Sequence, residues 1–395
     1  MKLYQKNICF VVSLNCSYGG NIIPSLVTLA SILEKKYNAT ILWILPTQEE
    51  REWIQRIQKK YKIYFIDPKQ NATTQLIKIF TSNPPDLIHS HYGTFDKATV
   101  YATQKLKLKT KIVWHIHSWI GYDFENNNLK LLRKIKRTFS YHKHYGIVGK
   151  NVHLIPVSEE VAAFSNYCRT HIIPFPPLKR ITIEGLPTLQ YSTNSTTIIN
   201  GIDFTRLHLP NDKKYPKTFT FFSFGGIETI KKIEYIIQAG IILRNKGIQD
   251  FKVLITNGIG TRNMLNRFFG DYNNSLPEWI ELEEQSENIS CFFSKASCYI
   301  SASIKETMAT ALAEASYFEI PIIQSDIWGT YWNANNPSVL LFRNKDIHDL
   351  ADKMEYMLNN YEHFKQACSI TKDNNLKRLS ISNWCNKIIE VYNKL

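Results

Sequence analysis

Short apolar runs alternate with longer amphipathic stretches along most of the chain. Runs rich in β-branched residues are typical of buried parallel strands, and the stretches between them have the spacing of helices that cover a sheet. The predicted strands are Ile8–Leu14, Thr40–Leu45, Ile63–Ile66, Asp86–His89, Lys111–His117 and His153–Val157 in the first half, and Thr218–Phe224, Lys252–Ile255, Trp279–Leu282, Cys298–Ser301, Pro321–Gln324 and Val339–Leu341 in the second. This order predicts an α/β fold with two Rossmann-like domains, each built on a doubly wound parallel sheet.

The length of the chain also favours two domains. Its 395 residues, 44% of them hydrophobic, exceed what one core usually holds. A polar segment bracketed by Pro210 and Pro216 is the candidate linker. We therefore expect one domain at residues 1–210 and a second that starts at residue 211 and ends near residue 375.

The charge of the chain is concentrated in its first half. The net charge is +14, with 27 Lys and Arg against 13 Asp and Glu in residues 1–210, and 21 against 21 in the rest. A one-sided basic surface attracts phosphate groups, anionic lipid or nucleic acid. Because no stacking motif or nucleic-acid module is recognisable, we expect no nucleic-acid partner and rank an anionic membrane surface first.

Several features favour a cytoplasmic location. No run approaches the roughly 18 consecutive apolar residues that a membrane span needs, and Met1–Gln5 leads into a strand without the layout of a secretory signal. Seven cysteines without a Cys-x-x-Cys pair suit buried, reduced thiols.

A glycine turn follows the first predicted strand of each domain. The first turn contains Gly19 and Gly20, and the second contains Gly225 and Gly226. Glycine lets the backbone approach a phosphate at a helix N-terminus, although the same turn can simply connect a strand to a helix. Neither turn has the dinucleotide fingerprint of a dehydrogenase.

The most informative segment follows the predicted strand Cys298–Ser301. It places Glu306 in a loop and Glu314 about two turns inside an Ala-rich helix. Two carboxylates there suit the hydroxyl groups of a sugar and a ribose, although two solvated glutamates would have the same spacing. The backbone N–H groups at the helix mouth, which suit a diphosphate, belong to Thr307, Met308 and Ala309.

This segment resembles the E-x7-E signature of the retaining GT-B enzymes of glycosyltransferase family 4. Four more segments resemble motifs of that family in the family's order: Asp86–His91, Val113–His117, Ile198–Arg206 and Ser382–Trp384. The resemblance implies a GT-B fold with an acceptor-binding domain at 1–210 and a nucleotide-sugar-binding domain at 211–375. It also implies that a last helix, within 376–395, returns to the first domain.

The resemblance implies a role for single residues. Glu306 would contact the transferred sugar, His117 would hydrogen-bond that sugar, and Glu314 would contact the ribose. Lys231, with Lys232 beside it, would stabilise the departing diphosphate. The family also places an Arg in this loop where the present chain has a glycine, Gly226.

These roles describe a retaining, metal-independent hexosyltransferase that uses a nucleotide sugar in cell-surface polysaccharide synthesis, with a glycan or lipid-linked glycan as acceptor. Positioning and electrostatics would supply most of the rate, and the departing phosphate would take the acceptor proton. Neither Asp-x-Asp nor a His/Cys ligand cluster stands out, so we expect no metal and no cofactor. The missing Arg leaves open a non-catalytic subunit that binds a partner enzyme or an acceptor.

Three further histidines belong to the motif segments Asp86–His91 and Val113–His117. His89 and His115 alternate toward the sheet interior and are expected in the core. His91 lies at the C-terminal end of its strand, where open α/β sheets bind ligands, and is therefore a candidate for the acceptor side.

The segment Leu129–Phe139 has the pattern of a basic amphipathic helix. Its apolar face contains Leu131, Leu132, Ile135 and Phe139, and its cations are Lys130, Arg133, Lys134, Lys136 and Arg137. Such a helix either packs on its own domain or contacts an anionic bilayer. The second possibility, with Arg133, Lys134 and Arg137 on the lipid side, predicts peripheral binding to the inner face of the cell membrane.

Overall fold

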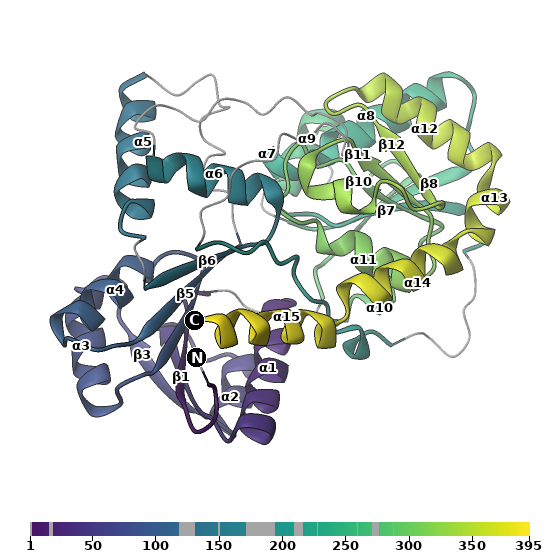
Figure 1. Cartoon of the computed structure of the whole chain (residues 1–395). Helices are drawn as coiled ribbons and strands as arrows, with labels where there is room; N and C mark the ends of the chain where they lie inside the picture. The colour runs from purple at the N-terminus through teal and green to yellow at the C-terminus, as the bar shows by residue number, and fades with distance from the viewer. Residues whose placement is uncertain are drawn as a thin grey trace. The chain divides into compact units, whose positions relative to one another are not determined.

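The computed structural model describes residues 2–15, 19–117, 131–148, 151–170, 194–208, 216–226, 228–258, 260–270, 276–286 and 288–395. The chain forms two compact units, called unit 1 and unit 2 below (Figure 1). Unit 1 is Met1–Gly201 together with Ile381–Leu395, and unit 2 is Ile202–Ser380. The change from one unit to the next falls a few residues before the predicted linker.

Unit 1 is a six-stranded parallel sheet with helices between the strands. Its strands are β1 (Asn7–Val12), β2 (Thr40–Pro46), β3 (Lys62–Ile66), β4 (Leu87–His91), β5 (Lys111–Ile116) and β6 (Val152–Pro156). Its helices are α1 (Ile22–Tyr37), α2 (Glu52–Gln58), α3 (Ala72–Ser82), α4 (Asp96–Lys105), α5 (Leu131–Tyr145), α6 (Glu159–Thr170) and α15 (Ile381–Lys394). The strand order β3-β2-β1-β4-β5-β6 reverses direction between β1 and β4, which makes the sheet doubly wound.

Continuous apolar strands are possible in unit 1 because helices cover both faces of its sheet. Successive residues of one strand, such as Phe10 and Val11, belong to two different buried clusters on opposite faces of the sheet. Phe10, Trp43 and Trp114 are all fully buried. The sequence therefore reads as apolar runs rather than as alternating polar and apolar residues.

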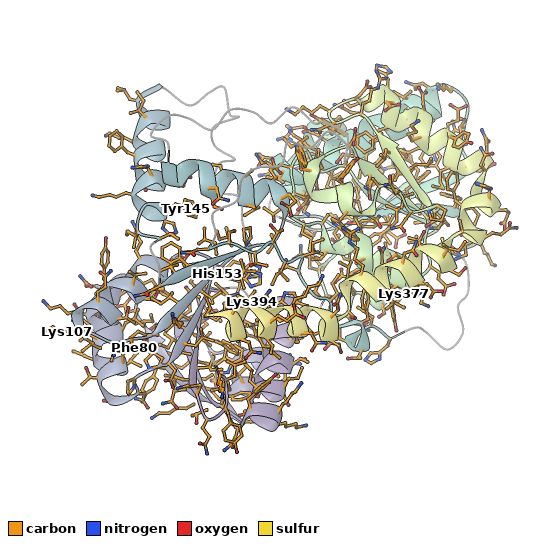
Figure 2. The ribbon with its side chains drawn as sticks, viewed as in Figure 1. Phe80, Lys107, Tyr145, His153, Lys377 and Lys394 are labelled. Carbon is orange, nitrogen blue, oxygen red and sulfur yellow. The ribbon has the colours of Figure 1, made fainter. Side chains whose placement is uncertain are left out.

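The last helix of the chain, α15, belongs to unit 1. It buries Trp384 and Tyr392 in the cluster that also contains Leu26 of α1. At its end, Lys394 lies close enough to His153 of β6 to contribute to the lowered pKa of that histidine; both residues are labelled in Figure 2. The return of the last helix to the first domain is thus confirmed.

Unit 2 repeats the architecture with a second six-stranded parallel sheet, in the order β12-β11-β10-β7-β8-β9. Its strands are β7 (Phe219–Ser223), β8 (Phe251–Thr256), β9 (Ile280–Glu283), β10 (Cys298–Ser301), β11 (Ile322–Ser325) and β12 (Val339–Phe342). Its helices are α7 (Glu228–Lys231), α8 (Ile233–Asn245), α9 (Thr261–Phe269), α10 (Ser290–Phe293), α11 (Thr310–Tyr317), α12 (Ile347–Asn359), α13 (Tyr361–Gln366) and α14 (Cys368–Leu379), with short 3-10 turns η3 (Phe204–Arg206) and η4 (Trp328–Asn333).

The predicted fold class is confirmed in both units. Each of the predicted strands overlaps an observed strand, and both sheets are parallel with helices between their strands. In the part of the chain that the structure describes, no helix has the length and apolar character needed to cross a membrane.

Candidate functional site

The predicted carboxylate and ammonium of unit 2 lie in direct contact. Lys231 is the last residue of α7, and Glu306 lies in the loop between β10 and α11. The Nζ of Lys231 is 2.6 Å from Oε1 of Glu306, and the hydroxyl of Ser303 donates to the same oxygen at 2.8 Å. Two residues 75 positions apart therefore form one charged group at the carboxyl edge of the sheet, where open α/β folds bind ligands.

Backbone contacts hold this group in place. The N–H of Ile304 donates to the carbonyl of Ile230 at 3.0 Å, which ties the loop after β10 to α7. On the other side, Gly329 packs against the backbone of Glu306 so closely that a Cβ at position 329 would lie 2.0 Å from the Glu306 carbonyl oxygen. Only glycine fits at position 329 without displacing the loop that carries Glu306.

Glu314 is buried in α11 and has a partner that sequence analysis missed. The guanidinium of Arg206, at the end of η3, donates to a carboxylate oxygen of Glu314. Both carboxylates also act on Tyr299 of β10: burial raises the pKa of that phenol, and the charges of Glu306 and Glu314 raise it further. Because Arg206 lies over 100 positions before Glu314, no local spacing rule could have found the pair.

The glycine turn of unit 2, Gly225 and Gly226, is required for close packing inside the unit. The N–H of Gly225 donates to Oγ1 of Thr256 at 2.8 Å, and a Cβ at Gly225 would lie 1.9 Å from the Thr256 carbonyl oxygen. A Cβ at Gly226 would lie 2.9 Å from Cγ of Lys231. Gly225 is thus needed for the approach of β7 to β8, and Gly226 leaves room for the lysine.

Two other predicted donor-binding groups are engaged within the fold. The Nζ of Lys232 is 2.8 Å from Oε1 of Glu234, so this lysine pairs with α8 rather than with Glu306. The N–H of Ala309 donates to the carbonyl of Gly329 at 3.1 Å. The predicted role of Ala309 as an N–H donor to a diphosphate is therefore not met in this conformation. The helix begins later than predicted, at Thr310, so Thr307 and Met308 precede it.

In unit 1, the predicted histidines lie side by side at the ends of two adjacent strands. Residue His91 of β4 is the register partner of His115 of β5, and His117 follows two residues later. The Nδ1 of His91 is 2.9 Å from Nε2 of His117. His91 is fully buried and His117 is 9% exposed. The structure thus joins the predicted catalytic histidine to the predicted acceptor-side histidine.

A second pair of histidines extends this group into the core. The Nδ1 of His89 is 2.6 Å from the hydroxyl of Tyr392 in α15, and its Nε2 is 3.2 Å from Nδ1 of His115. The core placement predicted for His89 and His115 is confirmed, because the two side chains are only 0% and 1% exposed. Desolvation by burial lowers the pKa of all four imidazoles, that of His117 to about 3, so they are neutral at physiological pH.

Three of these histidines could offer ligand atoms to a metal ion. One nitrogen each from His89, His91 and His115 lies within 4.8 Å of the others. Sequence analysis did not detect this cluster, because it arises from the register of two strands. Four of the six ring nitrogens of these three histidines already take part in hydrogen bonds. The partners are Tyr392 and His117, and His89 also bonds to His115. Chelation of a metal ion by all three residues would therefore require the network to rearrange.

The first glycine turn precedes α1. Gly20 has a φ of +54°, a left-handed conformation that favours glycine, and no atom lies within 4 Å of the position of its Cβ. The carbonyl of Gly19 accepts from the N–H of Ile23 at 3.2 Å and so starts the helix. Residues 16–18, directly before Gly19, lie outside the described residues.

The predicted basic helix is α5. Its exposed side chains include Leu132, Ile135 and Phe139, which are 73%, 43% and 57% exposed and share one face. Tyr141 and Tyr145, on the opposite face, are buried in the core of unit 1. The helix therefore packs through its tyrosines and presents an apolar stripe to solvent; the side chains of Arg133, Lys134 and Arg137 lie outside the described part.

Solved structures share the fold over the whole chain. A glycosyltransferase from Rickettsia africae is 16% identical, with a TM-score of 0.72 and coverage of 99% of this chain and 98% of that chain. HepE from Anabaena, solved with UDP and glucose, is 10% identical, with a TM-score of 0.76 and coverage of 99% and 100%. The lipopolysaccharide outer core galactosyltransferase WaaB is 10% identical, with a TM-score of 0.67 and coverage of 98% and 100%. The chain has the GT-B fold that these likenesses define.

The sequence of unit 2 also matches a protein-family model. Residues 207–373 match the protein-family model described as Glycosyl transferases group 1. This range lies within unit 2 and includes Lys231, Glu306 and Glu314. The second unit of this GT-B protein is therefore similar to that glycosyltransferase family, over less than half of the chain. A search of curated proteins finds no match.

Proposed function

We propose that this protein is a retaining glycosyltransferase that moves a hexose-type sugar from a nucleoside diphosphate to a glycan or lipid-linked glycan of the cell surface. The observation that carries the proposal is the contact between Lys231 and Glu306, held by Ser303 and by backbone bonds inside the segment that is similar to the glycosyltransferase group 1 family. An ammonium beside a carboxylate offers one group for a phosphate and one for sugar hydroxyls.

The chemistry that we propose for this pair is electrostatic. An ammonium has three N–H donors, so the bond from Lys231 to Glu306 leaves donors for an oxygen of the departing diphosphate. Glu306 accepts hydrogen bonds from the transferred sugar, and Glu314, held by Arg206, accepts from the ribose. We assign His117 to a hydrogen bond with the transferred sugar. No protein nucleophile takes part, and the departing phosphate accepts the proton of the acceptor hydroxyl.

The nucleotide and the acceptor are proposed from similar proteins. HepE was solved with UDP and glucose, and WaaB is described as a lipopolysaccharide galactosyltransferase. These properties support UDP-hexose as the first donor to test and a cell-surface glycan as the acceptor. The exposed apolar face of α5, in the basic half of the chain, supports a cytoplasmic enzyme that binds peripherally to an anionic membrane.

A panel of nucleotide sugars tests the donor. UDP-glucose, UDP-N-acetylglucosamine, GDP-mannose and ADP-glucose are each added to the protein, and a true donor raises the thermal midpoint because it binds only the folded state. Transfer of that donor's sugar with its anomeric configuration kept, read by proton NMR, supports retention. If none of the four binds, the non-catalytic alternative, a subunit that recruits a partner enzyme or acceptor, takes the place of the proposed transferase.

A substitution and a chelator test the chemistry. Glu306→Gln should lower turnover at least about tenfold with an unchanged thermal midpoint, whereas the surface substitution Glu355→Gln should change neither. Full activity of Glu306→Gln would remove the central assignment. We also propose that transfer needs no metal, so excess EDTA should leave activity unchanged; loss of activity that Mg²⁺ or Mn²⁺ restores would refute this.

A further inference from the structure

The ring of His117 is surrounded by other aromatic side chains, of which His91 is one. The two rings lie edge to edge and nearly coplanar, with centroids 5.2 Å apart and an interplanar angle of 23°. His115 stacks on His117 at 4.2 Å and Tyr92 stacks on it at 4.8 Å. Tyr92 adopts a left-handed φ of +68°, which a tyrosine rarely adopts. The position of the His117 ring is therefore determined by its neighbours on several sides.

Both partners of the His91–His117 hydrogen bond are neutral. His91 is fully buried, His117 is 9% exposed and their facing nitrogens are 2.9 Å apart, so a charge on either ring would be poorly solvated. A neutral imidazole carries one N–H and one lone pair. The bond between Nδ1 of His91 and Nε2 of His117 therefore has one donor, and two tautomer arrangements are possible.

The surroundings distinguish these two arrangements. If His117 donated, His91 would carry its proton on Nε2, an atom that is buried and has no hydrogen-bond partner among the described residues. A buried N–H without an acceptor is costly and rare. If His91 donates, its proton is used, and the proton of His117 is on Nδ1.

We propose that His91 is a positioning residue that donates from Nδ1 to Nε2 of His117 and thereby fixes His117 in the tautomer with its proton on Nδ1. In that tautomer His117 is a hydrogen-bond donor to a sugar oxygen and has no free Nε2 lone pair to act as a base. The link to a sugar rests on the proposed function, whereas the tautomer does not.

Nitrogen NMR of the whole protein labelled with ¹⁵N-histidine tests the tautomer directly. A protonated and a bare ring nitrogen have very different shifts, and His117→Asn identifies the signals of His117. We expect a protonated Nδ1 and a bare Nε2 at neutral pH in the protein without ligand. A protonated Nε2 on His117, or a doubly protonated ring, would overturn the proposal without any variant of His91.

Two matched variants separate positioning from core packing. His91→Phe keeps a ring in the stack but removes the donor, and should move the His117 proton to Nε2 in at least part of the molecules. His89→Phe makes the same change at a buried histidine that contacts Tyr392 and His115 instead, and should leave the tautomer of His117 intact. An unchanged His117 tautomer in a folded His91→Phe variant would contradict the proposed role.

Kinetics then connect the tautomer to the proposed reaction. With the nucleotide sugar that raises the thermal midpoint, His91→Phe should lower kcat about tenfold with KM within about twofold of the parent value, the pattern of an interaction made in the transition state. An unchanged kcat despite a shifted tautomer would overturn the functional part. If no nucleotide sugar binds at all, the proposed transferase fails, while the NMR result still decides the tautomer.

Discussion

The Nζ of Lys231 lies 2.6 Å from Oε1 of Glu306 and joins the end of α7 to the loop before α11. The ammonium is one third exposed and the carboxylate is 15% exposed, so the pair is partly shielded from water. Charge pairs in such settings interact more strongly than fully exposed ones. Under the proposed function, a donor diphosphate would therefore meet a cation that is already positioned.

Removal of that cation should impair the reaction strongly. We expect Lys231→Ala to lower kcat/KM by about 3 kcal/mol, the scale of one lost donor in a charge-stabilising site. Lys232→Ala is the matched control, because its ammonium pairs with Glu234, and it should lower kcat/KM much less. Steady-state kinetics with the identified nucleotide sugar measures kcat/KM of both variants. Parent-like turnover of Lys231→Ala would show that another residue contacts the phosphate.

An arginine at position 226, as in the glycosyltransferase family that the sequence resembles, should not strengthen nucleotide binding. A side chain at Gly226 begins 2.9 Å from Cγ and 3.2 Å from Cε of Lys231, so it would displace the lysine from Glu306. We expect both Gly226→Ala and Gly226→Arg to weaken UDP binding, since the shared Cβ causes the displacement. Titration calorimetry with UDP measures this; tighter binding by Gly226→Arg alone would show that the site accommodates a second cation.

Arg206 should contribute to nucleotide binding through Glu314. Glu314 is buried, so a lost guanidinium leaves its carboxylate without that charge partner. We expect Arg206→Gln to raise the Kd for UDP about tenfold, which is about 1.4 kcal/mol, and to lower the thermal midpoint. Arg343→Gln, at an arginine that is 75% exposed, is the control in the same unit. If Arg206→Gln lowers only the midpoint, the pair is structural.

The exposed face of α5 predicts membrane binding. We expect Arg133→Glu, Lys134→Glu and Arg137→Glu together to weaken sedimentation with vesicles that contain phosphatidylserine, at about 1 kcal/mol per charge near the surface. The same charge change at three exposed lysines of unit 2, Lys217, Lys252 and Lys377, is the control and should have a smaller effect. Equal sedimentation of the α5 variant and the parent would leave α5 as a structural helix only.

The buried histidines should make unit 1 sensitive to acid. Burial holds the folded pKa of His89 well below its value of about 6.5 in an unfolded chain. Below pH 6.5 the unfolded chain therefore binds more protons, and stability is lost as the pH falls. Each such histidine contributes about 2 kcal/mol of this loss at pH 5. The drop in thermal midpoint between pH 7 and pH 5 should be smaller in His89→Phe than in the parent; an equal drop would contradict the assignment.

The strands, their parallel arrangement and the loop position of Glu306 follow from local patterns in the sequence. Buried parallel strands must be apolar on both faces, so runs such as Thr40–Leu45 were visible without any tertiary information. The loop position of Glu306 followed from the strand before it and the Ala-rich helix after it. These are local properties, set by a few consecutive residues.

Which of these side chains contact one another depends on how the chain folds in three dimensions. The Arg206–Glu314 pair joins residues 108 positions apart, and the histidine network depends on the pairing of β4 with β5 and on the return of α15 with Tyr392. Likewise, sequence analysis predicts that the N–H of Ala309 faces a diphosphate, but the carbonyl of Gly329 in η4 accepts it. Contacts of this kind depend on sheet order and side-chain packing, and no periodicity along one segment of the sequence contains that information.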